Sequence, residues 1–326
     1  MSVTLIAELC QNHLGDFELV KNMVDEAVEA GATHIKIQHI YTKNLTFRPQ
    51  FEEGLTQNGI TQSIKRPWKP EFERLKPLEL TPEDNRKFVK YVESKGAVPL
   101  TTCFARCDIP AIKAEGFKAV KVASYDCASY QLLRELSDHF SEIFISTGAT
   151  FSNEIEKASE VLKGKRVKHS FLHCVTIYPT PLDEMHLSRL DWLKKFSQEA
   201  GFSDHSLVSR DGVFASKAAI ALGATVVERH FTILDEDKSK DGPVSIRPEH
   251  LRELKRFSEL SHEKQHEELD DEKPGWKEIL IGDADRELSH EELLNRDYYR
   301  GRFASPRESG KYHSATMVYN WEETRV

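Results

Sequence analysis

The chain has 326 residues, of which 39% are hydrophobic and 30% are charged, and its formal net charge at pH 7 is −8. This acidic balance excludes nucleic acid or an anionic membrane surface as the main partner, and no apolar run approaches the roughly 18 residues of a membrane span. The N-terminus lacks a basic start and reaches Glu8 too early for a secretory signal. The five cysteines form no CxxC pair, so we expect a reduced, cytoplasmic protein.

Short β-branched runs alternate with amphipathic helical segments along the chain. The candidate strands are residues 3–9, 34–38, 98–102, 119–124, 143–147, 167–174, 200–205 and 225–231. Strands separated by helices imply parallel pairing, and this number of units fits a closed barrel of about 250 residues. We therefore predict an α/β fold: a (β/α)8 TIM barrel over residues 1–262, with a short C-terminal extension over residues 263–326.

Two of the helical segments carry clear start and stop signals. An apolar stripe in residues 17–28 follows a candidate N-cap at Asp16 and is closed by Gly31. A similar stripe in residues 213–222 is closed by Gly223. These signals support helices between the candidate strands.

Two segments break the alternation. Residues 39–80 hold several aromatic residues and prolines without clear periodicity, and a loop of this length predicts a lid or a binding loop. The charge run HEKQHEELDDEKPGWKE, from residue 262, predicts a surface helix or linker. The following basic and aromatic stretch, residues 295–313, has little room for an independent core, and we expect its arginines to coat the surface.

Polar residues recur at the carboxyl ends of the candidate strands, where barrels of this kind hold their active sites. One buried polar group at a strand end has an ordinary structural explanation, but repetition around the whole barrel would be costly without a function. The set consists of Glu8, Lys36, Gln38, Thr102, Ser124, Asp126, Ser146, Tyr178, Ser203, Asp204, His205, Glu228 and His230.

The residue types indicate two kinds of binding. Lys36 and Lys121, together with serine and threonine hydroxyls, can form a cradle for a phosphate or a carboxylate. His205 and His230 end adjacent strands, which can place two imidazoles on one divalent ion. Such an ion would have open positions from which to polarise a carbonyl.

Carboxylates complete the candidate site. Glu8 and Asp126 are candidates for positioning or deprotonating water, with a structural ion pair to a nearby lysine as the alternative for each. In the stretch VVERHF, residues 226–231, period-two alternation sends Glu228 and His230 to the same side of the strand. We expect His230 to be a metal ligand and Glu228 to help orient it.

Several segments, in order between about residues 3 and 260, resemble the N-acetylneuraminate (sialic acid) synthase family. They are IAELCQNHLGDFELVKNMVDEAVEAGATHIKIQ, TTCF, VKVAS, ISTG, LHCVTIYPTP, GFSDH and ERHF. The resemblance implies a (β/α)8 barrel enzyme, a transferase that joins phosphoenolpyruvate to an N-acylated aminohexose such as N-acetylmannosamine and releases phosphate. It also implies a divalent metal, Mn2+ or Mg2+, as cofactor.

Matching positions extend the resemblance to single residues. They imply that His205 and His230 hold the metal and that Glu8 is the family's first-strand glutamate. Asp126 falls where the family more often has glutamate, and Thr176 falls where asparagine or serine is usual. The implied phosphoenolpyruvate ligands are Lys36, Thr102, Lys121, Ser124, Ser146 and Ser203, with Thr176 reaching the phosphate; the implied sugar-site residues are Gln38, Tyr178 and Asp241.

The C-terminal part departs from the family pattern. Typical members continue into a small antifreeze-like domain that reaches over the partner's barrel in a dimer and supplies an arginine to the sugar. The tail of this chain does not resemble that domain, and we expect the chain to be too short for all of it. Its basic cluster, Arg296, Arg300, Arg302 and Arg307, is expected to coat the surface, with substitution for the missing arginine as the alternative. The resemblance still implies a homodimer.

Three alternative functions stay open at this stage. A phosphoenolpyruvate-dependent synthase for a different aldose or an aldose phosphate would share the cradle and the metal. A metal-dependent hydrolase on a barrel would act without phosphoenolpyruvate. Its metal would usually have more protein ligands than two histidines. A non-catalytic sugar-binding relative would bind a sugar without releasing phosphate.

Overall fold

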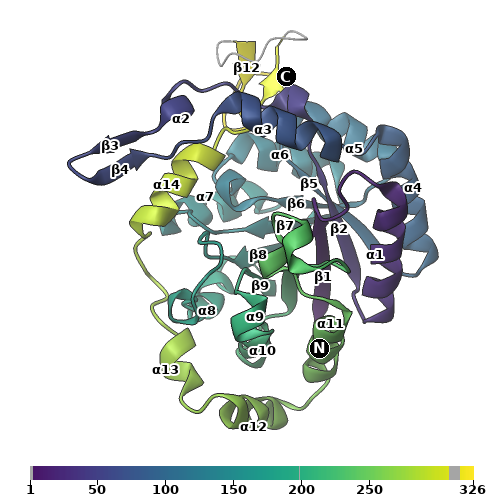
Figure 1. Cartoon of the computed structure of the whole chain (residues 1–326), viewed down its shortest axis with the longest axis vertical. Coiled ribbons are helices and arrows are strands. Elements are labelled where there is room, and N and C mark those ends of the chain that lie inside the picture. Colours follow the sequence, from purple (N-terminus) through teal and green to yellow (C-terminus); the bar gives the residue numbers. More distant parts are fainter. Residues whose placement is uncertain (1–2, 198, 308–315) are drawn as a thin grey trace.

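A closed barrel of parallel strands forms the centre of the molecule, surrounded by helices (Figure 1). The computed structural model describes residues 3–197, 199–307 and 316–326. The strands follow one another around the barrel in the order β1-β10-β9-β8-β7-β6-β5-β2. Their bounds are β1 Thr4–Cys10, β2 His34–His39, β5 Val98–Cys103, β6 Ala119–Val122, β7 Glu142–Ser146, β8 Lys168–His173, β9 Glu199–Asp204 and β10 Val226–His230. The predicted (β/α)8 barrel is confirmed.

Helices connect successive barrel strands and cover their outer side (Figure 1). They are α1 Phe17–Glu29, α4 Pro82–Ser94, α5 Ile109–Glu115, α6 Tyr130–His139, α7 Ser152–Leu162, α8 Arg189–Leu193, α9 Val208–Asp211, α10 Phe214–Ala221 and α11 Pro248–Ser258. The predicted N-cap is confirmed, because the Asp16 carboxylate accepts hydrogen bonds from the first turn of α1. Within the described ranges, no helix is long and apolar enough to cross a membrane.

The interior of the barrel changes from apolar to polar along the strands. One end is filled by a cluster of buried side chains: Ile6, Leu100, Ala119, Phe144, Leu172 and Val226. Two residues further along five of these strands, and so on the same face, stand Glu8, Thr102, Lys121, Ser146 and Glu228. The apolar layer therefore closes the barrel at its amino end, and the polar layer lies at the carboxyl end, where a site is accessible.

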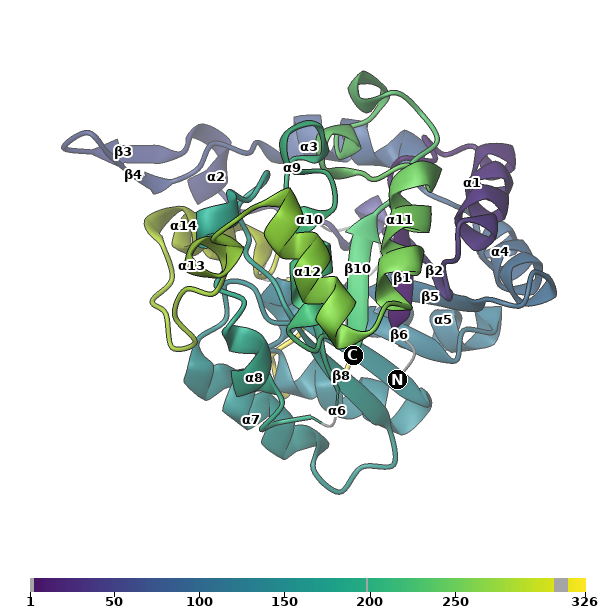
Figure 2. The same cartoon turned by 90° about the horizontal axis from the view of Figure 1, so that it is seen from below.

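The insertion at residues 39–80 has more structure than its sequence pattern indicates. It forms α2 Gln50–Glu53, a hairpin of β3 Leu55–Gln57 and β4 Ile60–Ser63, and α3 Trp68–Leu75. Figure 2 shows this insertion at the end of the barrel toward which the arrow of β10 points. Its position at the carboxyl end of the strands agrees with the expected binding loop.

The C-terminal segment passes along the barrel in α12 His262–Glu272, α13 Trp276–Leu280 and α14 His290–Tyr299, and ends with the short strands β11 Ser305–Pro306 and β12 Met317–Val318. Its arginines do not simply coat the surface as expected. Arg296 donates to the carbonyl of Ala149 and to Glu154, both at 2.6 Å. Arg302 forms an ion pair with Glu71 on α3. These arginines bind the barrel and the insertion because the segment folds back over the carboxyl ends of the strands.

Candidate active site

A cavity of about 430 Å³ lies at the carboxyl ends of the barrel strands. Its volume is within the range of about 300–1,000 Å³ that is usual for small-molecule sites. Among the residues that line it are Glu8, Lys36, Gln38, Thr102, Lys121, Ser124, Ser146, Tyr178, Ser203, His205, His230 and Asp241. The structure thus brings together all but three of the site residues expected from the sequence.

Lys36 on β2 lies between two buried carboxylates. Its ammonium group forms ion pairs with Glu8 on β1 and, at 3.3 Å, with Glu228 on β10. It also donates to Thr102 Oγ1 at 3.3 Å. Burial alone would lower the pKa of Lys36, but the charges of Glu228 and Glu8 outweigh it and raise the pKa above its usual value. Lys36 therefore stays charged.

Lys121 on β6 differs from Lys36, because no carboxylate among the described residues is within ion-pairing distance of it. Its ammonium group donates to Ser146 Oγ at 2.6 Å and to the carbonyl of Val122 at 2.9 Å. Burial lowers the pKa of Lys121 to about 8, and the nearby charge of Lys36 acts in the same direction. A buried ammonium group without a counter-charge favours an anionic ligand.

Glu228 connects Lys36 to Ser203. Its Oε1 accepts from Lys36 and, at 3.1 Å, from Ser203 Oγ. Burial opposes ionisation, but Lys121 and Lys36 outweigh it and lower the pKa of Glu228 to about 2. Its Oε2 is buried without a hydrogen-bond partner in the described part of the chain. The hydrogen bonds of Glu228 thus go to the lysine side of the cavity rather than to His230, which we had expected it to orient.

His205 and His230 lie side by side, with ring centroids 5.3 Å apart, as expected for the ends of adjacent strands. His205 is already engaged: its Nε2 contacts the Tyr178 hydroxyl at 3.0 Å, and its Nδ1 is 3.7 Å from Cys174 Sγ. Burial and the neighbouring His230 lower the pKa of His205 well below its usual value, so its imidazole is neutral. By contrast, Nδ1 of His230 is buried and has no hydrogen-bond partner among the described residues.

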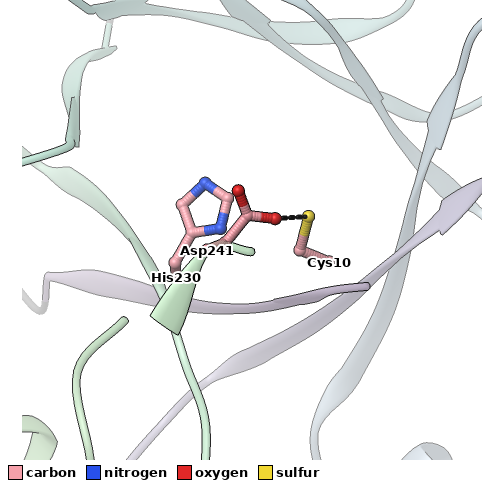
Figure 3. A group of neighbouring side chains, drawn as sticks. All are labelled: Cys10, His230 and Asp241. Atoms are coloured by element: carbon pink, nitrogen blue, oxygen red, sulfur yellow. Dashed lines mark hydrogen bonds between the residues drawn. The ribbon is translucent and has the colours of Figure 1, made fainter. Parts of the chain in front are cut away.

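Donor atoms of Cys10, His230 and Asp241 lie within 4.8 Å of one another (Figure 3). Cys10 ends β1, and its thiol donates to Asp241 Oδ2 at 2.9 Å. The backbone of Cys10 has a φ of 48°, a strained value for a non-glycine residue, and its N–H donates to Glu8 Oε1 at 2.6 Å. The divalent metal that the family resemblance implies fits this place, because the orphaned His230 nitrogen needs a partner.

Asp126, Thr176 and Asp204 are the three expected site residues that do not line the cavity. Asp204 instead forms an ion pair with Arg229 at 2.5 Å. The Asp126 carboxylate accepts from Ser129 Oγ at 2.8 Å and from Asn320 Nδ2 at 3.0 Å. Burial raises the pKa of Asp126 to about 6, although these two hydrogen bonds oppose the shift. The predicted strand over residues 119–124 ends at Val122, and the chain turns into a 3-10 helix. This turn aims Asp126 at the C-terminal segment.

The mouth of the cavity is basic and is built by segments far apart in the sequence. Arg66 and Arg74 come from the insertion, Lys240 from the loop after β10 and Arg302 from the C-terminal segment. Glu71 on α3 pairs with Arg74 at 2.9 Å and with Arg302. Burial opposes its ionisation, but these cations outweigh burial and lower its pKa to about 2. Glu291 also lines the cavity, and these two carboxylates beside four cations leave an excess of positive charge.

Part of the lining was not expected from the sequence: Cys10, Gln11, Arg66, Arg74, Phe104, Tyr125, Cys174, Lys240, Glu291, Asn295, Tyr299 and Arg302. For Cys10 a signal exists, since it follows Glu8 by two residues and comes directly after the candidate strand 3–9. For Arg302 there is none, because its place depends on the path of the C-terminal segment.

Comparison with known proteins places the chain among sugar-acid synthases. Residues 23–267 match the NeuB family. The chain is 30% identical to N,N'-diacetyllegionaminic acid synthase of Campylobacter jejuni, over 77% of this chain and 73% of that protein. It is also 30% identical to a pseudaminic acid synthase of Campylobacter jejuni, over 93% of this chain and 82% of that protein. A crystal structure of N-acetylneuraminic acid synthetase from Leptospira borgpetersenii, in complex with citrate, aligns with a TM-score of 0.68 and 27% identity over 91% of each chain.

The barrel and the cavity at its carboxyl end define a class, the (β/α)8 barrels with a site at the carboxyl ends of their strands, and the relatives named above are synthases of sialic-type acids. The chain belongs to the NeuB family. The resemblance noted from the sequence is confirmed.

Proposed function

We propose that this protein condenses phosphoenolpyruvate with an N-acylated aminohexose, of the N-acetylmannosamine type, to a nonulosonic (sialic-type) acid and releases phosphate. The observation that carries the proposal is Lys121, a buried cation of the cavity that donates to the Ser146 hydroxyl and lies near the paired Lys36. This arrangement suits a small, multiply charged anion. The names of the relatives support the same reaction class.

In this proposal phosphoenolpyruvate occupies the deep part of the cavity. Lys121 and Ser146 bind its anionic groups, while the hydroxyls of Thr102 and Ser203 contact Lys36 and Glu228, respectively. Fixing this reactant beside the sugar aldehyde removes much of the entropic barrier, by several kcal/mol in such cases. The methylene carbon then forms the new bond to the aldehyde carbon.

Water completes the reaction by adding to the carbon that carries the phosphate, after which the carbon–oxygen bond breaks and phosphate leaves. We propose that Glu8 is the acid–base group that deprotonates this water. Its carboxylate lines the cavity and is held by Lys36 and by the N–H of Cys10. We keep Asp126 as a second candidate from the sequence, although its carboxylate contacts Ser129 and Asn320.

A divalent metal is part of the proposal, with His230 and the adjacent His205 as the histidines that hold it. Bound there, the ion supplies Lewis acidity toward the aldehyde. Gln38, Tyr178 and Asp241 line the same cavity and are the proposed sugar contacts. The homodimer, the cytoplasmic location and a domain boundary at residue 262 stay predictions.

The direct test is release of inorganic phosphate from phosphoenolpyruvate with Mn2+, across N-acetylmannosamine and its diacetamido relatives. We expect release that requires both the metal and one of the sugars. A folded, metal-loaded protein that releases no phosphate with any sugar, but binds one tightly, would be a non-catalytic relative. Turnover of an ester or amide without phosphoenolpyruvate would indicate the hydrolase.

A second candidate substrate is favoured by the basic mouth. Arg66, Arg74, Lys240 and Arg302 line the entrance, and the carboxylates near them are Glu71 and Glu291. An acceptor with its own anionic group, such as an aldose phosphate, would match this charge. The substrate panel should therefore include each sugar with and without a terminal phosphate, and the ratio of the two kcat/KM values decides between the candidates.

A further inference from the structure

One group of side chains in the cavity contains potential metal ligands other than the two histidines expected from the sequence. Cys10 ends β1 and His230 ends β10, the neighbouring strand, while Asp241 comes from the loop that follows β10. Figure 3 shows the three side chains turned toward a common space. Each offers a metal-ligand atom, and all of these atoms lie within 4.8 Å of one another.

The imidazole of His230 provides an independent sign that a ligand is bound here. The side chain is 8% exposed, and its Nδ1 has no hydrogen-bond partner within the described residues. A buried nitrogen left without a partner costs free energy. Cys10 and Asp241 satisfy each other at 2.9 Å and leave that nitrogen unsatisfied. A cation between the three side chains would satisfy all of them.

The distances suit a metal ion after small side-chain movements. Bonds of about 2.0–2.3 Å from nitrogen, oxygen and sulfur to a tetrahedral ion set neighbouring ligand atoms about 3–4 Å apart. A second acidic group, Glu253, Glu268 and Glu272, also has closely spaced oxygen atoms. That group is already occupied by the ammonium of Lys217, so it carries no comparable site.

We propose that Cys10 and Asp241, together with His230, coordinate the metal ion of this cavity, and that the ion is a thiolate-bound transition metal such as Co2+, Fe2+ or Zn2+ rather than Mg2+. The thiol releases its proton to solvent as the bond to the ion forms. Thiolate and imidazole ligands select such ions, whereas Mg2+ prefers oxygen ligands. The inference deepens the proposed function, because it assigns Asp241 to the ion rather than to the sugar.

His205, the other histidine proposed to hold the ion, lies beside these three residues. Its two ring nitrogens face Tyr178 and Cys174, so it stands beside the three ligands with a ring-centroid distance of 5.3 Å to His230. The variant Cys174→Ser therefore distinguishes two possible metal sites, because a site built on His205 and Cys174 would use the thiol of Cys174 instead of the thiol of Cys10.

The experiment is a Co2+ titration of the chelator-treated full-length protein, followed by absorption spectroscopy and calorimetry without any substrate. We expect a near-ultraviolet sulfur-to-cobalt charge-transfer band in the parent protein, and excess Mg2+ should not remove it. Cys10→Ser should abolish the band and weaken Co2+ binding at least about tenfold. Asp241→Asn should weaken binding about 10- to 100-fold while the band remains. Cys103→Ser, another buried thiol, is the matched control and should keep the band.

Three results would overturn the inference: Co2+ binding without the band, a band that persists in Cys10→Ser, or a band lost only in Cys174→Ser. If Cys10→Ser does not fold, alkylation of the parent protein gives the answer. Co2+ should protect Cys10 from iodoacetamide, as read by peptide mass spectrometry, and an unprotected Cys10 refutes the site. Phosphate release is measured separately, so turnover without the band contradicts this inference alone, and the band without turnover contradicts the proposed function alone.

Discussion

Arg302, in the C-terminal segment, forms an ion pair with Glu71 on α3, 231 positions earlier in the chain. Arg48 of the insertion contacts the same segment, because its guanidinium donates to the carbonyls of Asp297 and Arg300. The entrance to the cavity is thus assembled by two segments that lie outside the alternation of strands and helices. We expect both segments to influence which acceptor binds in the cavity.

The first prediction concerns this entrance. Arg302→Ala should raise the KM for the acceptor about tenfold, because loss of a charge-assisted contact of roughly 1.5 kcal/mol corresponds to that factor. The KM for phosphoenolpyruvate, which is proposed to lie deeper, should change little. Arg307→Ala is the control, since Arg307 pairs with Glu322 and does not line the cavity. Equal effects on both KM values would contradict a role in acceptor recognition.

The second prediction concerns His230. His230→Ala should lower phosphate release by at least about 100-fold and remove the bound metal, while circular dichroism shows an unchanged fold. The exposed His139→Ala is the matched histidine variant and should retain both. Full activity of His230→Ala with a normal metal content would exclude His230 as a ligand.

The third prediction is a pH dependence that arises from Lys121. Burial lowers its pKa to about 8, so the ammonium form that binds an anion predominates below that pH and is lost above it. The kcat/KM for phosphoenolpyruvate should therefore fall as the pH rises through about 8. Lys121→Arg keeps its charge over this range, and its remaining activity should not show this fall. The same fall in both proteins would assign the titration to another group.

The fourth prediction separates a structural from a catalytic role for Asp126. Its pKa is raised to about 6 from an ordinary value of 3.8, so the stability that its protonated form contributes is present below pH 3.8 and is lost as the pH rises through 6. Asp126→Asn should therefore raise the free energy of unfolding at pH 7 by about 1–3 kcal/mol, with almost no gain near pH 3.5.

Urea denaturation at several pH values measures this effect, with the exposed Asp138→Asn as the control. Because the Asp126 carboxylate contacts Ser129 and Asn320, we expect Asp126→Asn to keep most of the phosphate-release activity. A loss of two or more orders of magnitude would instead identify Asp126 as an acid–base group.

The barrel could be predicted from the sequence because its pattern is local and periodic. Alternation in VVERHF correctly placed Glu228 and His230 on the inner side of β10. It also placed Arg229 on the other side, where its guanidinium pairs with Asp204 at 2.5 Å. Site residues that lie within strands were found for the same reason, since a period of two fixes which side chains face the interior.

The features that could not be predicted from the sequence depend on turns and on contacts between residues far apart in the chain. The strand before Ser124 ends at Val122, and the 3-10 turn that follows aims Asp126 at Asn320 instead of the cavity. The role of Arg302 required knowledge of how the C-terminal segment folds back. Neither feature leaves a periodic signal in the residues around it.

The backward path of the C-terminal segment also has a consequence for the order of events during protein synthesis. The barrel strands and α11 are complete by Ser258, and a ribosome-bound chain of that length already holds every strand it needs to close the ring. Tyr299 and Arg302, which finish the entrance, emerge later, and Asn320 later still. Because domains tend to fold as they emerge, the entrance of a nascent barrel would stay incomplete until this segment has been synthesised.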